Sequence, residues 1–548
     1  MASIKQILAV AIGLTSGIVA TSVKNPSAPT PKPVSSVSCN GKGYSYDHLA
    51  GFGALKSDAR DKYGDTISIG SSIAVKKWRK SGNKYKATLY GLPDRGWNTN
   101  GTQNTVPRVH IFDITFTPTP DVSVAKPSGP NLQFDYKETI LLSGPDGKPM
   151  TGLDADPTGG LTYPGFPTMP AATFPGDGFG GPGSGDKRLA LDAEGLVVEE
   201  DGSFWISDEY GPSLYKFSQS GKLVASVQPP DAILPIRDKK TSFASNNPPI
   251  YGQIAPPTPA DPDHGRQNNQ GFEGLTVSPD GKTLWVMLQS AARQDGGASS
   301  SKRRNTRFLK YSLSNSHRRR HNNDNGKVEA KYEAEYVVPL PTLVNAAGQT
   351  RVAAQSEIHY ISDTQFLVLP RDSSVGRGYP ETLSRYRHVD IVDISGATNI
   401  KGPKFDNIQN GNITTGAIES PSDVLVSGIT PATLCPFVDF NINTELNKFK
   451  ASNGDVVHNG GVADLGLLNE KWESLALLPV SGDQHQGRDE KDEYYLITIS
   501  DNDFITDNGY INFGKIKYAD ASSSVPFLDQ QALVFKITLP KGSKPLVG

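Results

Sequence analysis

The 548-residue chain lacks an excess of charge of either sign, because 55 Lys and Arg residues nearly balance 57 Asp and Glu residues. A net charge of -2 gives no overall positive field that would attract a nucleic acid, so we expect no nucleic-acid partner. Long helical stretches are also lacking, since 55 glycines and 41 prolines punctuate the chain, and this excludes a coiled coil. What remains is a large folded protein that is rich in turns.

Long hydrophobic runs are scarce as well. After the N-terminal segment, no stretch approaches the ~18 apolar residues that a membrane-spanning helix needs. Residues 1–20 combine the basic Lys5, an apolar run that starts at Ile7, and small residues before Ala20, which indicates a signal peptide over residues 1–20. A single membrane anchor is the alternative. We expect a secreted, extracellular protein with no membrane contact once the signal peptide is removed.

The sequence has only two cysteines, Cys39 and Cys435. In an oxidising compartment an even pair indicates one disulfide, and two unpaired thiols are the alternative. Glycosylation sequons begin at Asn100 and Asn412, and we expect glycans at both positions.

Helical periodicity is weak, and the best candidate helix lies near residues 431–450. Residues 21–46 are rich in Pro and Ser, which predicts a linker, and residues 47–548 are interpreted as a single domain. Within that domain, short apolar segments alternate with turns that contain Gly, Pro, Asp and Asn, as expected for β-strands. The fold class is therefore all-β.

An internal repeat refines this prediction. Each copy has a strand that a Glu opens, a turn, and a second strand. Glu194-Gly-Leu-Val-Val precedes Phe204-Trp-Ile-Ser-Asp-Glu, and Glu273-Gly-Leu-Thr-Val precedes Leu284-Trp-Val. Two more copies open at Glu357 and Glu473, and a diverged copy lies within residues 50–145. A repeated unit of several strands is typical of a propeller blade, so we predict a β-propeller of five to seven blades, with six favoured, and long rim loops.

Residues at equivalent positions of the blades would meet at one mouth of the central channel. The candidate metal ligands are Glu194, Glu273, Glu357, Glu473, Asp94, Asp501 and Asp503. The candidate catalytic residues are Asp208, Glu209, Arg95 and Arg371. Converging carboxylates raise one another's pKa, so bound cations, interleaved arginines or protonation must relieve them. For each Glu the alternative role is a hydrogen bond to the backbone of the next blade.

The residue types at this mouth indicate a class of chemistry. Oxygen ligands without clustered His or Cys favour Ca²⁺ or Mg²⁺ over Zn²⁺, and we expect Ca²⁺. Acidic groups next to arginine suit the recognition of a metal-bridged phosphate or another anion. The sequence has no His-Glu-x-x-His, no Gly-x-Ser-x-Gly and no P-loop, which leaves these common catalytic motifs out of consideration.

Four segments together resemble the phytase-like family, whose members are described as having esterase-like activity of phytase. They are Asp192-Ala-Glu-Gly-Leu, Phe204-Trp-Ile-Ser-Asp-Glu-Tyr-Gly-Pro, Gly271-Phe-Glu-Gly-Leu and Trp472-Glu-Ser-Leu. The resemblance covers roughly residues 50–540 and implies a β-propeller with phosphoester hydrolase activity. β-Propeller phytases hold several Ca²⁺ ions with carboxylates at the channel mouth, but their ligands do not transfer to this sequence residue by residue.

These observations lead to a first hypothesis and two alternatives. The first is a secreted, calcium-dependent phosphoesterase in which Asp208, Glu209, Asp501 and Asp503 hold the metal while Arg95 and Arg371 hold phosphate oxygens. The alternatives are a non-catalytic, calcium-stabilised binding propeller and a lactonase-type carboxyl esterase. We expect a small phosphorylated or ester substrate and a monomeric protein. The sequence leaves open whether the protein is an enzyme.

Overall fold

The structure, a computed structural model, describes residues 32–96, 101–251, 256–314, 330–408, 411–482, 492–520 and 522–548. Residues Pro33–Gly548 form one compact unit. The expected signal peptide over residues 1–20 and the sequon at Asn100 lie outside the described residues, whereas Asn412 is described and half-buried.

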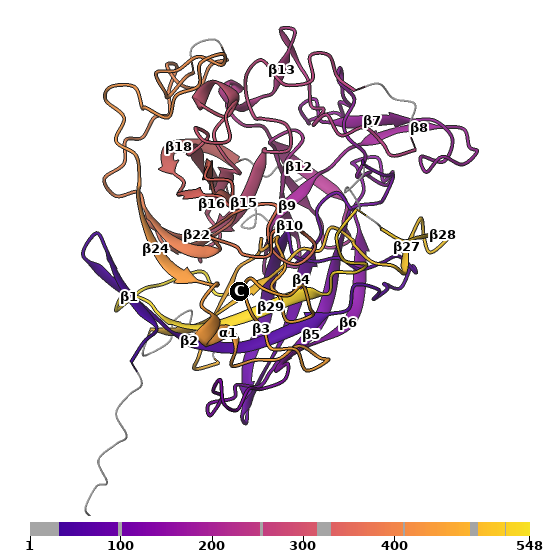
Figure 1. Cartoon of the computed structure of the whole chain (residues 1–548). Coiled ribbons are helices and arrows are strands. Elements are labelled where there is room, and N and C mark those ends of the chain that lie inside the picture. Colours follow the sequence, from indigo (N-terminus) through magenta and orange to yellow (C-terminus); the bar gives the residue numbers. More distant parts are fainter. Residues whose placement is uncertain are drawn as a thin grey trace, which may run out of the picture. The chain divides into compact units, whose positions relative to one another are not determined.

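Strands dominate the described residues (Figure 1). Three separate antiparallel sheets contain four strands each. In every one of them the strands pair in chain order, so that each sheet is a simple meander. The first contains β9 (Ala193–Val198), β10 (Phe204–Asp208), β11 (Leu214–Phe217) and β12 (Leu223–Val227). The second contains β15 (Phe272–Val277), β16 (Thr283–Leu288), β17 (Asn305–Leu313) and β18 (Ala330–Pro339). The third contains β21 (Ala354–Ser362), β22 (Gln365–Arg371), β23 (His388–Asp393) and β24 (Thr433–Asp439).

A nine-stranded sheet contains two further four-stranded antiparallel runs. One run is β3 (Ser72–Ser81), β4 (Lys84–Leu92), β5 (Arg108–Phe116) and β6 (Leu132–Leu141). The other is β25 (Ala476–Pro479), β26 (Glu493–Ile499), β29 (Gln530–Thr538) and β2 (Lys42–Leu55). The two runs meet where Gly53 of β2 lies parallel to Leu132 of β6. A Cβ on Gly53 would lie 2.5 Å from the Leu132 carbonyl oxygen, so this close approach requires glycine.

The N-terminal strand β2 completes the run that the C-terminal strands begin, because it pairs along its length with β29. β1 (Ser35–Cys39) forms a hairpin with β2, so the linker predicted over residues 21–46 is wrong for its last residues. In β1 the polar residues Ser36 and Ser38 are exposed, whereas Val37 is half-buried and Cys39 is buried. The side chains of Val37 and Cys39 therefore give the hairpin an inner face.

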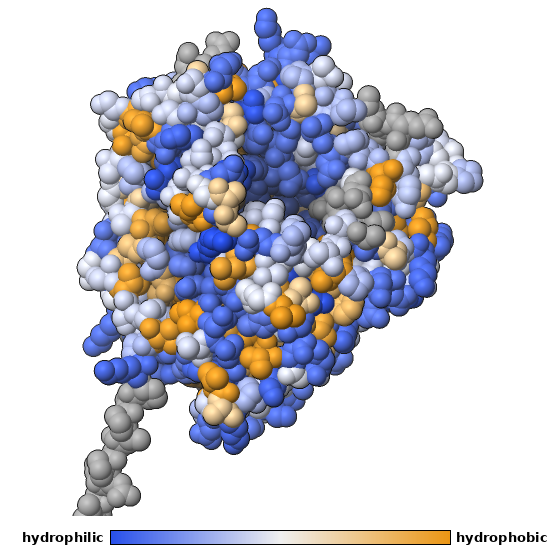
Figure 2. Space-filling view, in the orientation of Figure 1, coloured by the Kyte–Doolittle hydropathy of each residue, from blue (hydrophilic) through white to orange (hydrophobic). Residues whose placement is uncertain are grey.

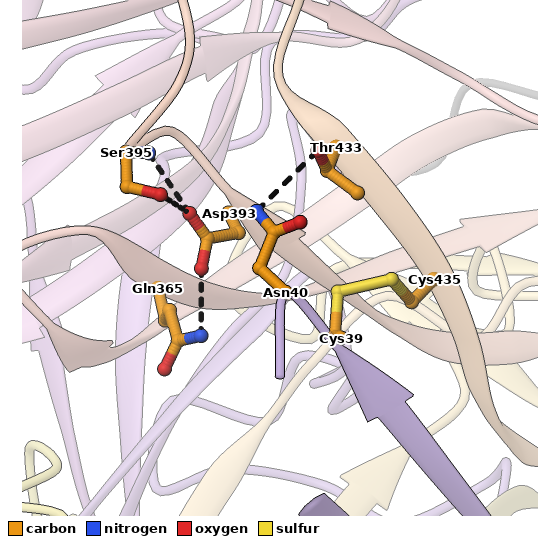
Figure 3. The surroundings of a disulfide bond; sticks show 7 residues. All are labelled: Cys39, Asn40, Gln365, Asp393, Ser395, Thr433 and Cys435. Carbon is orange, nitrogen blue, oxygen red and sulfur yellow. Dashed lines mark hydrogen bonds between the residues drawn. A yellow bond between two sulfur atoms is a disulfide. The ribbon is translucent and has the colours of Figure 1, made fainter. Parts of the chain in front are cut away.

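The predicted disulfide is confirmed: Cys39 of β1 is bonded to Cys435 of β24 (Figure 3). The bond joins residues 396 positions apart and connects two neighbouring runs of strands. Polar contacts surround it, since Gln365 Nε2 donates a hydrogen bond of 2.7 Å to Asp393 Oδ2 and Lys42 Nζ donates one of 3.0 Å to Gln365 Oε1.

The helix expected near residues 431–450 is largely absent. β24 occupies its first half, and one helical turn, α1 (Asn443–Leu446), follows. In the part of the chain that the structure describes, α1 is the only α-helix. The longer connections carry two-stranded sheets, which pair β7 (Ala171–Phe174) with β8 (Asp186–Leu189), β13 (Ile236–Arg237) with β14 (Lys240–Thr241), β19 (Thr342–Val344) with β20 (Thr350–Val352), and β27 (Gly509–Ile511) with β28 (Ile516–Tyr518).

The hydrophobic core consists mainly of five clusters, each of which lies between two consecutive four-stranded runs. Pairs of residues that represent the five clusters are Val109 with Leu196, Trp205 with Leu275, Met287 with Ile358, Leu369 with Leu477, and Leu478 with Val75. The last cluster returns to the run that starts at β3. The packing therefore passes through all five runs and back to the first.

The C-terminal residues contact β21 and β25, each of which is the first strand of its four-stranded run. The Leu546 N–H donates to the Tyr360 carbonyl oxygen at 3.1 Å, and His359 Nε2 lies 3.0 Å from the Leu546 carbonyl oxygen. The Gly548 N–H donates to the Leu477 carbonyl oxygen at 3.1 Å. This tail, residues 546–548, therefore links β21 to β25, two strands that no described ladder joins.

Candidate functional site

A cavity of about 210 Å³ lies where strand ends from all five runs converge. Seven carboxyl groups and three cationic side chains contribute to its walls, and Figure 2 shows a hollow with hydrophilic walls on the face that is drawn. The lining residues are Asp94, Arg95, Asp192, Glu194, Asn269, Glu273, Gln289, Arg371, Tyr379, Glu470, Lys471, Glu473 and Asp503.

The repeat explains why these residues meet. In an antiparallel pair, the start of the first strand and the end of the second strand lie at the same end of the sheet. Glu273 follows the first residue of β15 and Gln289 follows the last residue of β16, next to the pair Phe272 and Leu288. The Gln289 side-chain amide accordingly donates a hydrogen bond to Glu273 Oε1. Strand ends of the other runs reach the same cavity through Asp94, Glu194, Arg371 and Glu473, although Glu357, at the position equivalent to Glu273, does not.

Seven of the eleven candidate site residues line this cavity. They are Asp94, Arg95, Glu194, Glu273, Arg371, Glu473 and Asp503. Glu209 and Asp501 lie directly behind the lining, because each shares a carboxylate cluster with residues of the wall. Asp208 and Glu357 do not line the cavity.

The first carboxylate cluster contains Asp94, Asp501 and Asp503. The Lys471 ammonium lies among them, with Nζ 2.9 Å from Asp501 Oδ2 and 2.8 Å from Asp503 Oδ1. Burial raises the pKa of Asp503 to about 6, although Lys471 opposes the shift. Burial acts in the same direction on Asp501, but there Lys471 and donated hydrogen bonds prevail and hold the pKa below its ordinary value.

The second carboxylate cluster contains Asp192, Glu194 and Glu209, whose ligand oxygens lie within 4.8 Å of one another. Burial, and after it the charge of Glu273, raises the pKa of Glu194 well above its usual value. Burial and the charge of Asp192 do the same to the pKa of Glu209. This cluster is therefore one that a proton or a bound cation would stabilise.

Two buried carboxylate oxygens, one in this cluster and one beside it, have no hydrogen-bond partner in the described part of the chain. Among the described residues, neither Glu209 Oε2 nor Glu273 Oε2 has a hydrogen-bond donor, and both side chains are almost completely buried. Leaving a buried acceptor unsatisfied costs about 1–3 kcal/mol. Unpaired oxygens of this kind are the donor set that a hard cation such as Ca²⁺ uses.

The two arginines of the site are fixed by ion pairs. Arg95 Nη1 lies 2.8 Å from Asp192 Oδ2, and the Arg95 backbone N–H donates to the same carboxylate. Arg371 donates to Glu470 Oε1 at 3.0 Å and to Glu473 Oε1. Each guanidinium is thereby held in one orientation at the cavity wall, as bidentate and buried arginine pairs generally are.

The carboxyl of Asp208 contacts backbone groups instead of the cavity. Its Oδ1 accepts the N–H groups of Asp192 and Tyr210, and its Oδ2 accepts the N–H of Gly211 at 2.7 Å. Burial raises the pKa of Asp208 to about 7. The bond from Asp192 places that residue next to Arg95, so Asp208 supports the wall from behind.

The Glu357 carboxyl links the first strands of four of the runs. Its Oε1 accepts the N–H groups of Leu275 and Ile358, and its Oε2 lies 2.5 Å from Ser72 Oγ. Ser72 Oγ in turn accepts the Leu196 N–H at 3.0 Å. The four strands β3, β9, β15 and β21 are thus linked around one carboxyl group, which is the structural role that the sequence offered as the alternative.

Several lining residues were not predicted from the sequence, although the spacing of two of them from a repeated Glu marks their position. Asp192 and Lys471 each stand two positions before a repeated Glu, and side chains two apart lie on the same face of a strand. Asn269, Tyr379 and Glu470 lie in connecting segments outside the repeat, where no periodic pattern marks them.

Comparison with known proteins defines the class. Residues 81–504 match the model of the phytase-like family, described as esterase-like activity of phytase, so the chain belongs to this family. An uncharacterized secreted protein of Arthroderma benhamiae is 47% identical over 510 residues, which cover 90% of this chain and 95% of that protein. The expectation of secretion is thereby confirmed, and the chain is a secreted phytase-like protein. Within the described ranges, no helix is long and apolar enough to cross a membrane.

Two solved structures are similar over most of their length. A luciferin-regenerating enzyme has 11% identity and a TM-score of 0.25, and the match covers 88% of this chain and 98% of that chain. The α-L-arabinofuranosidase PaAbf62A of Podospora anserina has 9% identity and a TM-score of 0.29, with coverage of 89% and 97%. At these TM-scores the similarities carry no argument about fold or function.

Proposed function

We propose that this protein hydrolyses phosphate esters in the polar cavity and depends on a bound divalent cation, Ca²⁺ in the first place. Family membership supports a phosphoester substrate. The observation that carries the proposal is the charge of the walls. Seven carboxyl groups stand against three cations, and Glu209 Oε2 and Glu273 Oε2 have no donor among the residues that the structure describes. An anionic substrate enters such a cavity only when a cation offsets this charge.

The residues that fit the cation best are Asp192, Glu194 and Glu209, with Glu273 beside them. All four offer oxygen, which suits Ca²⁺ or Mg²⁺, and water would complete the six to eight ligands that Ca²⁺ takes. The sequence-based ligand set also included Asp501 and Asp503. Those two carboxylates hold the Lys471 ammonium, so we omit them from the proposed ligands.

A bound Ca²⁺ would supply a Lewis acid at the phosphoryl oxygens and would favour ionisation of water. The side chains of the protein provide the rest. Arg95 and Arg371, oriented by their ion pairs, offer further N–H donors to the remaining phosphate oxygens. Asp503 lines the cavity and has a pKa of about 6, which suits it to accept a proton from the attacking water near neutral pH.

For Asp208 we propose a positioning role in place of the metal-binding role that the sequence suggested. Its two oxygens are engaged by three backbone N–H groups, one of which belongs to Asp192. The reacting groups would then be Arg95, Arg371 and Asp503, and the ligands would be Asp192, Glu194 and Glu209.

We further propose that the five four-stranded runs are the blades of a five-bladed propeller, in place of the six blades that the sequence favoured. Support comes from the circular order of the five hydrophobic clusters and from the first strands, since β25 lies next to β3, β3 next to β9, β9 next to β15, and β15 next to β21. The fifth blade would be closed by β2 against β29.

The test uses the purified secreted protein after treatment with a chelator. We expect it to release phosphate from a panel of phosphomonoesters only after Ca²⁺ is restored, and we expect Glu194→Gln to lose at least 100-fold in kcat/KM. The variant Glu381→Gln is the control and keeps its activity, because the Glu381 carboxyl does not line the cavity and contacts only Arg385 at 3.6 Å and the Leu383 N–H at 3.4 Å among the described residues. Full activity in chelator, or an active Glu194→Gln, would overturn the proposal.

A second candidate is a non-catalytic binding propeller that calcium stabilises. The observation in its favour is that all three cations of the cavity already form ion pairs with carboxylates of the wall or just behind it. A rise of the melting temperature with Ca²⁺, together with no turnover of phosphate or carboxyl esters, would support this alternative. Turnover of carboxyl esters alone would point to the lactonase-type esterase.

A further inference from the structure

The Lys471 ammonium occupies the position among the carboxylates at which a bound metal cation would otherwise lie. Four carboxylates surround its ammonium: Nζ lies 2.8 Å from Asp503 Oδ1, 2.9 Å from Asp501 Oδ2, and 3.5 Å from both Asp94 Oδ2 and Glu473 Oε2. The Lys471 side chain is 17% exposed, so water screens these contacts only in part. Burial would lower the pKa of Lys471, but the surrounding carboxylates, Asp501 foremost, raise it well above the usual value.

Among the described residues, no lysine ammonium forms an ion pair with the second cluster. Asp192 is paired with Arg95, whereas Glu209 Oε2 and Glu273 Oε2 have no donor in the described part of the chain. Glu209 is 0% exposed and Glu273 2%, so bulk water does not supply the missing partner. The two clusters open on the same cavity. The first holds the Lys471 ammonium among its carboxylates, whereas in the second Arg95 pairs with Asp192 and no described donor reaches Glu209 Oε2.

An ammonium and a divalent cation cannot share one set of carboxylates. Ca²⁺ requires its oxygens at about 2.3–2.6 Å, and an ammonium already in contact with the same oxygens would lie against it with like charge. The positive charge of Lys471 is covalently attached to the backbone between Glu470 and Glu473. It therefore cannot dissociate from the cluster as a metal ion can.

We propose that Lys471 is a built-in cation that fills the Asp94–Asp501–Asp503 cluster, so that the cavity binds a single exchangeable divalent cation, at Asp192, Glu194 and Glu209. The second half of this statement rests on the proposed function, whereas the first half does not. Lys471 is a positioning residue in this scheme, because it keeps the four carboxylates together and leaves one place for a mobile ion.

The test is calorimetric titration of the chelator-stripped full chain with Ca²⁺, which reads stoichiometry without any substrate. We expect one site in the wild type, two in Lys471→Met, and none in Glu209→Gln. The double variant Lys471→Met/Asp501→Asn should return to one. Lys536→Met is the matched control, because Lys536 also contacts two carboxylates, Glu493 at 2.8 Å and Asp47 at 3.8 Å, and it should leave the count at one.

A second variant covers the case in which Lys471→Met does not fold. Asp501→Asn in the wild-type background should keep one Ca²⁺ site if Lys471 fills the cluster, and a lost site would overturn the role of Lys471. Two sites in the wild type, or a single site in both the wild type and a folded Lys471→Met, would overturn it as well. No site in the wild type with one in Lys471→Met would uphold the built-in cation and reject the calcium site of the proposed function, so the two failures are distinguishable.

Discussion

Glu357 is a buried side chain that holds four strands together through hydrogen bonds. Its carboxyl contacts Ser72 Oγ and two backbone N–H groups, and burial raises its pKa to about 8. At neutral pH the protonated carboxyl therefore prevails, and a protonated carboxyl can donate to Ser72 while its other oxygen accepts the two N–H groups. Glutamine has nearly the same shape and likewise places a donor opposite Ser72 and an acceptor opposite the two backbone N–H groups.

We predict that Glu357→Gln is at least as stable as the wild type at pH 5 and exceeds it by a margin that grows as the pH rises, while Glu357→Ala loses about 3 kcal/mol at pH 5 because two backbone donors and Ser72 lose their partner. The pH dependence follows from the raised pKa. The folded protein holds a proton that the unfolded chain releases above its ordinary value of 4.5, so this stabilisation declines as the pH rises toward about 8, by up to ~1.4 kcal/mol per pH unit. Glu357→Gln should remove that part of the decline.

Urea unfolding of the wild type and both variants between pH 5 and 8 measures these differences. A Glu357→Gln variant with the same pH slope as the wild type would show that Glu357 is ionised in the folded protein. A Glu357→Ala variant as stable as the wild type would show that the strands do not depend on this carboxyl.

At this scale the sequence revealed the positions but not their roles. Glu194, Glu273, Glu357 and Glu473 are equivalent in the repeat, yet three line the cavity and Glu357 joins strands. The difference arises from Ser72, which comes from a distant strand and which no local pattern connects with Glu357. The charge balance of the site was hidden for a similar reason, since Lys471 contacts Asp94 from a segment 377 positions away along the chain.

Among the elements, the hairpin of β1 and β2 depends on a covalent link to another sheet. The Cys39–Cys435 bond attaches β1 to β24, and β2 pairs with β29. A bond that closes so long a loop restricts the unfolded chain strongly.

We predict that the double variant Cys39→Ser/Cys435→Ser loses about 4 kcal/mol of unfolding free energy. Denaturant unfolding with and without a reducing agent measures the loss. Reduction should destabilise the wild type by the same amount and leave the double variant unchanged. A wild type that is insensitive to reduction would mean that the strand pairs of β2 alone hold the hairpin.

Element prediction succeeded where the pattern was local. Strands β9, β10, β15, β16, β21 and β22 coincide with the repeated segments, because apolar runs between turns are a local signal. The segments near residues 35–46 and 431–450 were misjudged. Their strands exist because distant partners, β29 for β2 and β23 for β24, supply the hydrogen bonds.

In the molecule as a whole, the tail at residues 546–548 connects parts that the sheets leave unconnected. It joins Tyr360 of β21 to Leu477 of β25 by backbone hydrogen bonds, and Leu546 packs against two of the five main clusters. Tyr360 lies three positions after Glu357, and Leu477 lies four positions after Glu473.

We predict that deletion of residues 546–548 lowers the free energy of unfolding by about 3 kcal/mol, through three hydrogen bonds and a half-buried leucine. Calorimetric melting measures the loss. The side-chain variant Leu546→Ala keeps the backbone contacts and should lose about 1 kcal/mol. A deletion variant that melts with the wild type would mean that the five clusters alone hold β21 and β25 together.

The pairing of β2 with β29 also constrains the order of events during export. Synthesis and translocation deliver the N-terminal strand first, and it then waits for a partner that lies some 480 residues behind it. Until that partner has entered the secretory compartment, the exposed edge of β2 is open to chaperones and to wrong partners. Quality control in the cell therefore acts on a chain whose first long strand lacks its partner for most of the time that the polypeptide is being made.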